Sequence, residues 1–203
     1  MPGLQILWWR AFTATAAGIL FLGCGDAVDP GSRFLSTSEL LILALQPTAP
    51  QPAAATIEVS NAQVTAHSIV HDDGFNTPFL TVEFPATCLE SVDGRSVGDT
   101  ETVQVTVRPA TGRYGFSLAP SGLTLRSGCG AAARFSFSRY GDLSVADGSS
   151  TYLDRGAYAA ALDLWREIGP GRWEIVPGSQ PSGTDAVEGA MEASGSYVLA
   201  APR

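Results

Sequence analysis

The chain has 203 residues and a formal net charge of −8, and its composition is 45% hydrophobic and 16% charged. The length suits one domain with an additional segment, and the composition excludes a disordered acidic tail or a fibrous repeat protein. The acidic balance argues against nucleic acid as a partner, because no basic surface would release counterions from phosphates. All 12 of its Lys and Arg residues are arginine, so lysine Schiff-base and P-loop chemistry are excluded.

The first 24 residues have the pattern of an export signal. Residues 11–23 form an uncharged apolar run after Arg10, of a length typical of a signal-peptide core and too short to span a bilayer. An uncleaved anchor that includes Arg10 is one alternative. The run ends in Gly23-Cys24, which resembles the lipobox of bacterial lipoproteins, although Phe21 replaces the usual leucine. The resemblance implies cleavage after residue 23 and lipid on the Cys24 thiol, and a secretory signal with a chance cysteine is the other alternative.

Three cysteines are an odd number for a protein outside the cytosol. If Cys24 carries lipid, Cys88 and Cys129 remain and can pair, closing a loop of about 40 residues. Two separate buried thiols are the alternative. Zinc is disfavoured because neither cysteine has a second ligand at the short spacing of zinc sites. We expect no metal and no cofactor.

Residues 24–55 are predicted to be an anchor and linker ahead of a domain at residues 56–203. Ser36 and Glu39 have capping-box spacing, and the apolar run 40–45 predicts one short helix, with a strand as the alternative. Residues 46–55 are rich in proline and alanine, which predicts a semi-extended spacer between the domain and a membrane.

From residue 56 the hydrophobic period switches to two, which predicts short β-strands. Apolar and polar side chains alternate over residues 56–61, 63–70, 79–84, 103–108, 114–119 and 134–138. Turn-forming residues bound each of these stretches. We therefore expect an all-β fold, an antiparallel β-sandwich of short strands with one solvated face per sheet.

Residues 152–168 fit two structures. The apolar side chains from residue 158 onward have helical spacing, whereas the Gly-Pro-Gly turn at 169–171 favours a hairpin, which we expect after about residue 160. Two last strands are expected at residues 185–191 and 196–201.

The hairpin can form in two registers. A two-residue turn at 170–171 places Glu167 opposite Glu174, whereas a three-residue loop places Arg166 opposite Glu174. Like charges directly opposite each other are destabilising, and a type II Pro-Gly turn has the wrong twist for a hairpin. We therefore predict the three-residue loop and the pairing of Arg166 with Glu174.

Several stretches between residues 56 and 201 resemble a known module. They are Val82-Glu83-Phe84-Pro85, the region from Tyr114 to Leu125 with its Pro120-Ser121-Gly122 turn, Ala133-x-Phe135-x-Phe137, Arg172-Trp173-Glu174-Ile175-Val176-Pro177 and the closing residues 194–200. This pattern is similar to the zonula-occludens/netrin-receptor β-sandwich module, also found in ankyrins, as it occurs in a group of bacterial lipoproteins. Some relatives cleave themselves at a His-Phe-Ser triplet. Glu192-Ala193-Ser194 stands there in this chain, so self-cleavage is not expected.

Few residues form a catalytic or metal-binding pattern. Residues 128–133 match a dinucleotide fingerprint, but a strand pattern follows them instead of a helix, so a turn is expected. His67 and His71 would lie about 13 Å apart on a strand, too far to share a metal ion. Three loop acids could hold calcium but lack the EF-hand spacing, and we interpret them as solvated: Asp142, Asp147 and Asp154.

We therefore expect no catalytic residue, a lipid on Cys24, and a non-enzymatic extracytoplasmic protein of the bacterial cell envelope that acts as a structural or binding module. Its expected partners are the membrane, through the lipid, and an envelope protein or polysaccharide. One alternative is a secreted or anchored hydrolase with a loop-built site around His67 or His71. Another is a calcium-dependent adhesion domain.

Overall fold

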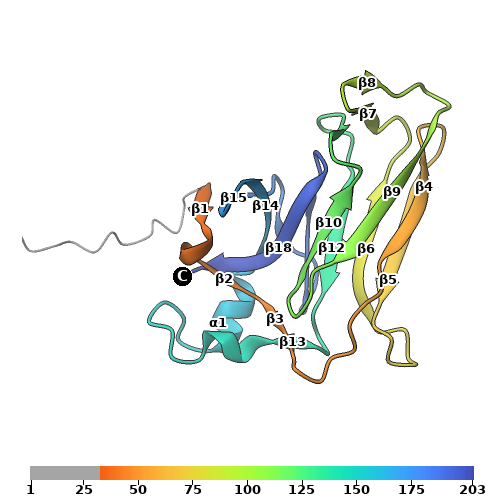
Figure 1. The fold of residues 1–203 in the computed structure, drawn as a ribbon. Coiled ribbons are helices and arrows are strands. Elements are labelled where there is room, and N and C mark those ends of the chain that lie inside the picture. Colours follow the sequence, from red (N-terminus) through yellow and green to blue (C-terminus); the bar gives the residue numbers. More distant parts are fainter. Residues whose placement is uncertain (1–32) are drawn as a thin grey trace, which may run out of the picture.

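The fold is a β-sandwich in which two main sheets face each other (Figure 1). The computed structural model describes residues 33–203, and all strand pairs in that range are antiparallel. The larger sheet has the order β1-β15-β14-β18-β10-β9-β4, with β2 also paired to β18. Its strands are β1 (Phe34–Ser36), β2 (Leu40–Ile42), β4 (Ala55–Ser60), β9 (Thr102–Pro109), β10 (Gly115–Ala119), β14 (Asp163–Gly169), β15 (Arg172–Ile175) and β18 (Gly195–Pro202). The expected all-β fold is confirmed.

The second main sheet has the order β16-β17-β12-β6-β5. Its strands are β5 (Thr65–Val70), β6 (Pro78–Phe84), β12 (Ala132–Ser136), β16 (Gln180–Pro181) and β17 (Ala186–Ala190). Two small sheets close the ends of the sandwich, one of β7 (Leu89–Val92), β8 (Arg95–Ser96) and β11 (Leu123–Leu125), the other of β3 (Ala44–Leu45) and β13 (Gly141–Asp142). No helix within residues 33–203 is long and apolar enough to cross a bilayer.

Aromatic side chains fill the space between the two main sheets. Phe79 of β6 lies 5.3 Å from Phe135 of β12 and 5.2 Å from Tyr114, measured between ring centroids. Phe116 of β10 stacks on Tyr197 of β18 at 4.9 Å. All five side chains are at most 1% exposed. Four of them fit the alternation of residues along a strand, whereas Phe79 is buried at the register shift between β5 and β6, although the residue after it is buried too. The alternation seen in the sequence thus builds most of this core.

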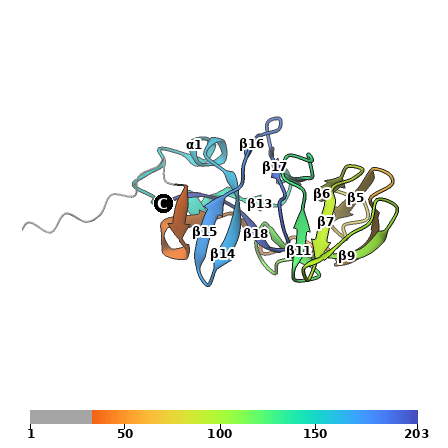
Figure 2. The same ribbon diagram turned by 90° about the horizontal axis from the view of Figure 1, so that it is seen from above.

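Two strands between residues 34 and 42 belong to the larger sheet. β1 pairs with β15, and β2 pairs with the end of β18, so the expected linker is corrected at residues 34–45 to the three short strands β1, β2 and β3 with a 3₁₀ turn between the first two (Figures 1 and 2). The short helix expected over 40–45 is also wrong. Ser36 and Glu39 do form a capping box, but it caps a single 3₁₀ turn, Thr37–Glu39 (η1).

The expected spacer is held against one end of the sandwich. The Pro50 carbonyl oxygen lies 2.8 Å from Nδ1 of His71, and Nε2 of Gln51 donates to the Ala110 carbonyl at 3.2 Å. Pro52 is buried. The proline- and alanine-rich stretch is therefore a connection fixed to the domain at three points.

Residues 152–168 contain both of the expected structures in succession. A short helix, α1 (Arg155–Ala160), buries Tyr158 and is followed by β14. β14 and β15 then form the expected hairpin, with Arg166 opposite Glu174 and their side chains 3.2 Å apart. The predicted register is confirmed, but the loop differs. Gly169 pairs with Arg172 around a two-residue turn, and a bulge at Ile168 restores the register.

Candidate functional site

A groove of about 610 Å³ crosses the outer face of the larger sheet. Its floor lies on β10 and β18, which are neighbours in the middle of the sheet in Figure 1. One wall comes from β9 and the turn that follows it, and the other comes from the β14–β15 hairpin and the 3₁₀ turn η1. The volume is in the range of small-molecule binding sites.

The polar residues of the groove come from four neighbouring strands. Arg108 of β9 pairs with Ser117 of β10, which pairs with Ser196 of β18, so these three side chains lie in one row on one face. Glu167 of β14 continues the row. In the antiparallel pair of β14 and β18, Arg166 lies opposite the residue after Ser196, so Glu167 lies beside Ser196 itself. The row therefore runs from a cation through two hydroxyls to a carboxylate.

A small apolar cluster, here called the outer cluster, supports the wall on the hairpin side. Its members are Leu35, Leu40, Trp165, Trp173, Val198 and Ala200. Trp173 Nε1 donates to Thr37 Oγ1 at 2.8 Å, and Trp165 Nε1 donates to the Ala200 carbonyl at 3.0 Å. The backbone N–H of Thr37 also donates to the Gly171 carbonyl at 2.9 Å. These contacts tie η1 to the tip of the hairpin, so the wall is preformed.

The charges on the two walls differ. Arg108 and Arg113 line the first wall, both are exposed, and neither makes an ion pair within residues 33–203. On the second wall, Glu167 Oε1 accepts a 3.2 Å hydrogen bond from the Gly171 N–H. Five other arginines do have carboxylate partners: Arg33, Arg95, Arg139, Arg155 and Arg166. Arg126, Arg134, Arg172 and Arg203 make no ion pair within residues 33–203 either, so Arg108 and Arg113 are distinguished by lining one wall of the same groove.

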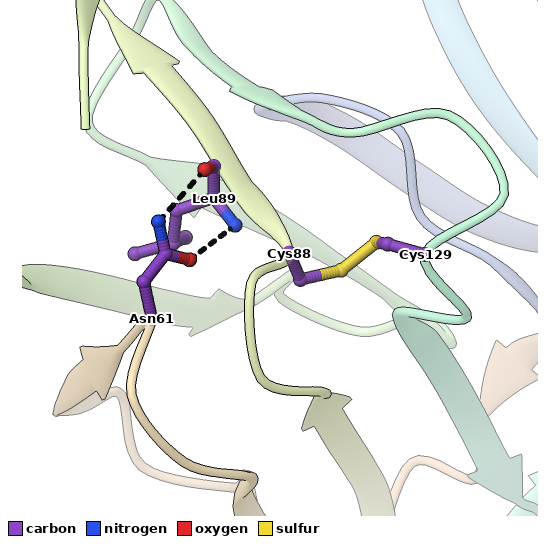
Figure 3. The surroundings of a disulfide bond; sticks show 4 residues. All are labelled: Asn61, Cys88, Leu89 and Cys129. Atoms are coloured by element: carbon purple, nitrogen blue, oxygen red, sulfur yellow. Dashed lines mark hydrogen bonds between the residues drawn. A yellow bond between two sulfur atoms is a disulfide. The ribbon is translucent and has the colours of Figure 1, made fainter. Parts of the chain in front are cut away.

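Of the site residues expected from the sequence, Cys24 lies outside the described residues. The Cα atoms of Cys88 and Cys129 lie 5.3 Å apart, within the range that a disulfide requires, and their sulfurs are joined (Figure 3). Next to the bridge, the buried Asn61 side chain accepts from the Leu89 N–H at 2.8 Å and donates to the Leu89 carbonyl at 3.0 Å. The bridge at Cys88 therefore lies directly before a second, non-covalent clamp on the first residue of β7.

The two histidines occupy different environments. His67 is partly exposed on β5, and His71 is 1% exposed just after that strand. His71 binds the Pro50 carbonyl through Nδ1, and its Nε2 has no hydrogen-bond partner among the described residues. Asp73 is close by, but its carboxylate binds Thr77 and Tyr140 instead. The hydrogen bond from Thr77 holds the pKa of Asp73 well below its usual range.

The three loop acids have local structural roles. Asp142 accepts from the Ser144 N–H at 3.0 Å at the start of the 3₁₀ turn Leu143–Ala146 (η2), and Asp154 accepts from the Ala157 N–H at 2.8 Å at the start of α1. Asp147 forms an ion pair with Arg155, whose hydrogen bond lowers the pKa of Asp147. No three His, Cys, Asp or Glu side chains between residues 33 and 203 converge as a metal site.

Comparisons of the chain with protein families, with curated proteins and with solved structures find no match. The groove could not be predicted from the sequence. Its polar residues are far apart in the chain and meet only through strand register: Arg108, Ser117, Glu167 and Ser196. The alternation around residues 103–108 and 114–119 did place Arg108 and Ser117 on polar faces of strands, but it could not say which strands are neighbours.

Proposed function

We propose that this protein is a non-enzymatic, lipid-anchored binding module of the bacterial cell envelope, exposed outside the cytoplasm. The groove on the outer face of the larger sheet is the observation that carries the binding role. Among the described residues that line it there is one carboxylate and no histidine or cysteine, so its serines have no imidazole base beside them. The groove offers cations and hydroxyls for recognition and lacks the groups that activate a serine nucleophile.

Cysteine usage supports a location outside the cytoplasm. Disulfides persist in oxidising compartments, and the Cys88–Cys129 bridge closes a long loop in a buried part of the domain. The bridge leaves Cys24 as the one remaining cysteine, directly after the small residue Gly23 at the end of an apolar run. Cys24 is therefore our proposed site of lipid attachment.

The position of β1 sets the distance between the domain and the membrane in this proposal. Only nine residue steps separate Cys24 from Arg33, the residue before β1. A fully extended chain of that length spans roughly 30 Å. The groove would therefore face ligands close to the membrane surface. The spacer at residues 46–55 adds no reach, because it comes after β1 and β2 have joined the sheet.

Fatty-acid labelling in a bacterial host tests the anchor. We expect Cys24→Ser to abolish the label and to move the protein from the membrane pellet to the soluble fraction, because stable anchoring requires the acyl chains. The matched control is the double variant Cys88→Ser/Cys129→Ser, which should keep its label. A label that persists on Cys24→Ser, or an unlabelled parent protein, would refute the anchor.

A further inference from the structure

We infer that the groove binds an acidic oligosaccharide, a polyhydroxylated chain that carries carboxylate groups. This inference rests on the proposed binding function and names the ligand class of the same site. Four features support it: two unpaired arginines, a floor of hydroxyls, a single acceptor carboxylate and the lack of a free strand edge.

The arginines fix the charge of the ligand. Arg108 and Arg113 line the same wall, and within the described part of the chain neither has a carboxylate partner. A guanidinium group presents a planar fork of donors that matches the two oxygens of a carboxylate. Two such forks on one wall therefore favour a ligand that presents carboxylates along one side.

The rest of the groove matches hydroxyl groups. Ser117 and Ser196 lie next to each other on the floor, and each can both donate and accept hydrogen bonds. Glu167 uses one oxygen for the Gly171 N–H, so its second oxygen can accept from a ligand hydroxyl. Arg108 and Glu167 are separated by three strand spacings, about 14 Å. A sugar chain could thus place carboxylates at one wall and hydroxyls at the floor and the other wall.

The backbone of the floor argues against a peptide ligand. β10 is paired with β9 and β18, and β18 is paired with β10 and β14, so the strands under the groove have no free edge. An extended peptide that binds by strand addition needs such an edge for its own N–H and C=O groups. The floor of the groove must therefore recognise a ligand through side chains. The arginines, serines and glutamate of the groove are of the types that bind the hydroxyl and carboxylate groups of sugars.

The residues that line the groove also indicate which interactions hold the ligand. Trp173 is 4% exposed, because it is held in the outer cluster and by Thr37. It therefore offers little surface for a sugar ring to stack on. Binding should depend mainly on charge and hydrogen bonds, and it should weaken as salt is raised.

Titration calorimetry on the unanchored Cys24→Ser protein tests the ligand class. The probe is a galacturonic acid oligomer, and the comparison ligands are a neutral dextran oligomer of equal length and an oligoglutamate. We expect the galacturonate to bind best, and Arg108→Ser/Arg113→Ser to weaken it at least tenfold, because each charged hydrogen bond contributes substantially. The control Arg126→Ser/Arg203→Ser removes the same charge from exposed arginines outside the groove and should change binding about twofold or less.

A second measurement distinguishes failure of the acidic-oligosaccharide inference from failure of the proposed binding function. The same unanchored proteins are sedimented with isolated bacterial envelopes, after urea unfolding has shown that each variant is folded. Galacturonate binding no tighter than dextran or oligoglutamate, or equal losses in the two arginine pairs, would overturn the acidic-oligosaccharide inference. If Arg108→Ser/Arg113→Ser nevertheless loses retention on envelopes, the binding module stands with another ligand. If it is retained like its parent, the groove is not the binding site.

Discussion

Removal of the Cys88–Cys129 bridge should lower the free energy of unfolding by about 4 kcal/mol. The two cysteines are 41 positions apart, and the chain-entropy relation for a closed loop of that length gives about 4 kcal/mol at 25 °C. The folded state should survive the change, because Asn61 holds both backbone groups of Leu89, the residue next to Cys88, independently of the bridge. Most of the effect should therefore come from the unfolded chain, which gains freedom.

Urea unfolding of Cys88→Ala/Cys129→Ala, in a Cys24→Ser background, measures this loss. At a slope of about 2 kcal/mol/M the midpoint should fall by about 2 M. Reductant should lower the midpoint of the parent by a similar amount and should leave the variant unchanged. The bridge would be absent if reductant left the midpoint of the parent unchanged. It would also be absent if the unfolded, unreduced parent had two thiols that can be alkylated.

Three further outcomes are expected. Asn61→Ala should lower the free energy of unfolding by about 3 kcal/mol in a urea titration, because the side chain binds three backbone groups, and a loss under 1 kcal/mol would contradict this. Tyr158→Phe should cost about 1 kcal/mol in the same assay, because its hydroxyl donates to the buried Leu41 carbonyl at 3.1 Å, and an unchanged midpoint would count against that bond. The hydrogen bond from Arg95 lowers the pKa of Glu101 to about 2 from 4.5, so its contribution is complete above about pH 4.5 and is lost as the pH falls toward 2. Thermal unfolding should show this acid loss in the parent and a smaller loss in Glu101→Gln.

The strands could be predicted where one face of a sheet is wet. The stretches 79–84 and 103–108 form β6 and β9 within a residue or two. Residues 80–84 and 103–108 alternate because one side of each strand lies in the core and the other meets water, whereas Phe79 is buried at the register shift between β5 and β6. The register of the β14–β15 hairpin was also predictable, since opposite charges meet across it. In both cases the information is local to one or two strands.

The leucine run at 40–45 shows where local information fails. Leu41, Leu43 and Leu45 point into the main core, whereas Leu40 points into the outer cluster. Both faces of this segment are therefore buried, and its sequence shows no alternation between apolar and polar residues. From sequence alone, such a run cannot be distinguished from a short buried helix, because nothing local shows that its two faces pack against two different apolar clusters.

The groove depends on still longer-range information. Its row of polar side chains needs β9, β10, β18 and β14 to lie side by side in one register, and this order does not follow the order of the strands in the chain. A serine or arginine on the wet face of a strand has the same local pattern whether it lines a groove or an open surface. Neighbouring strands decide which of the two it is.

The place of β18 in the larger sheet has a consequence for how the protein can be made. This strand comes late in the chain, at residues 195–202, yet it lies between β10 and β14 and also pairs with β2. A nascent chain that still lacks it would leave β2, β10 and β14 with unpaired edges, which invite association with other chains. The sheet can therefore be completed only after residues 195–202 have emerged from the ribosome or from a translocation pore, and proteolysis before residue 195 should leave an aggregation-prone remnant in place of a smaller folded domain.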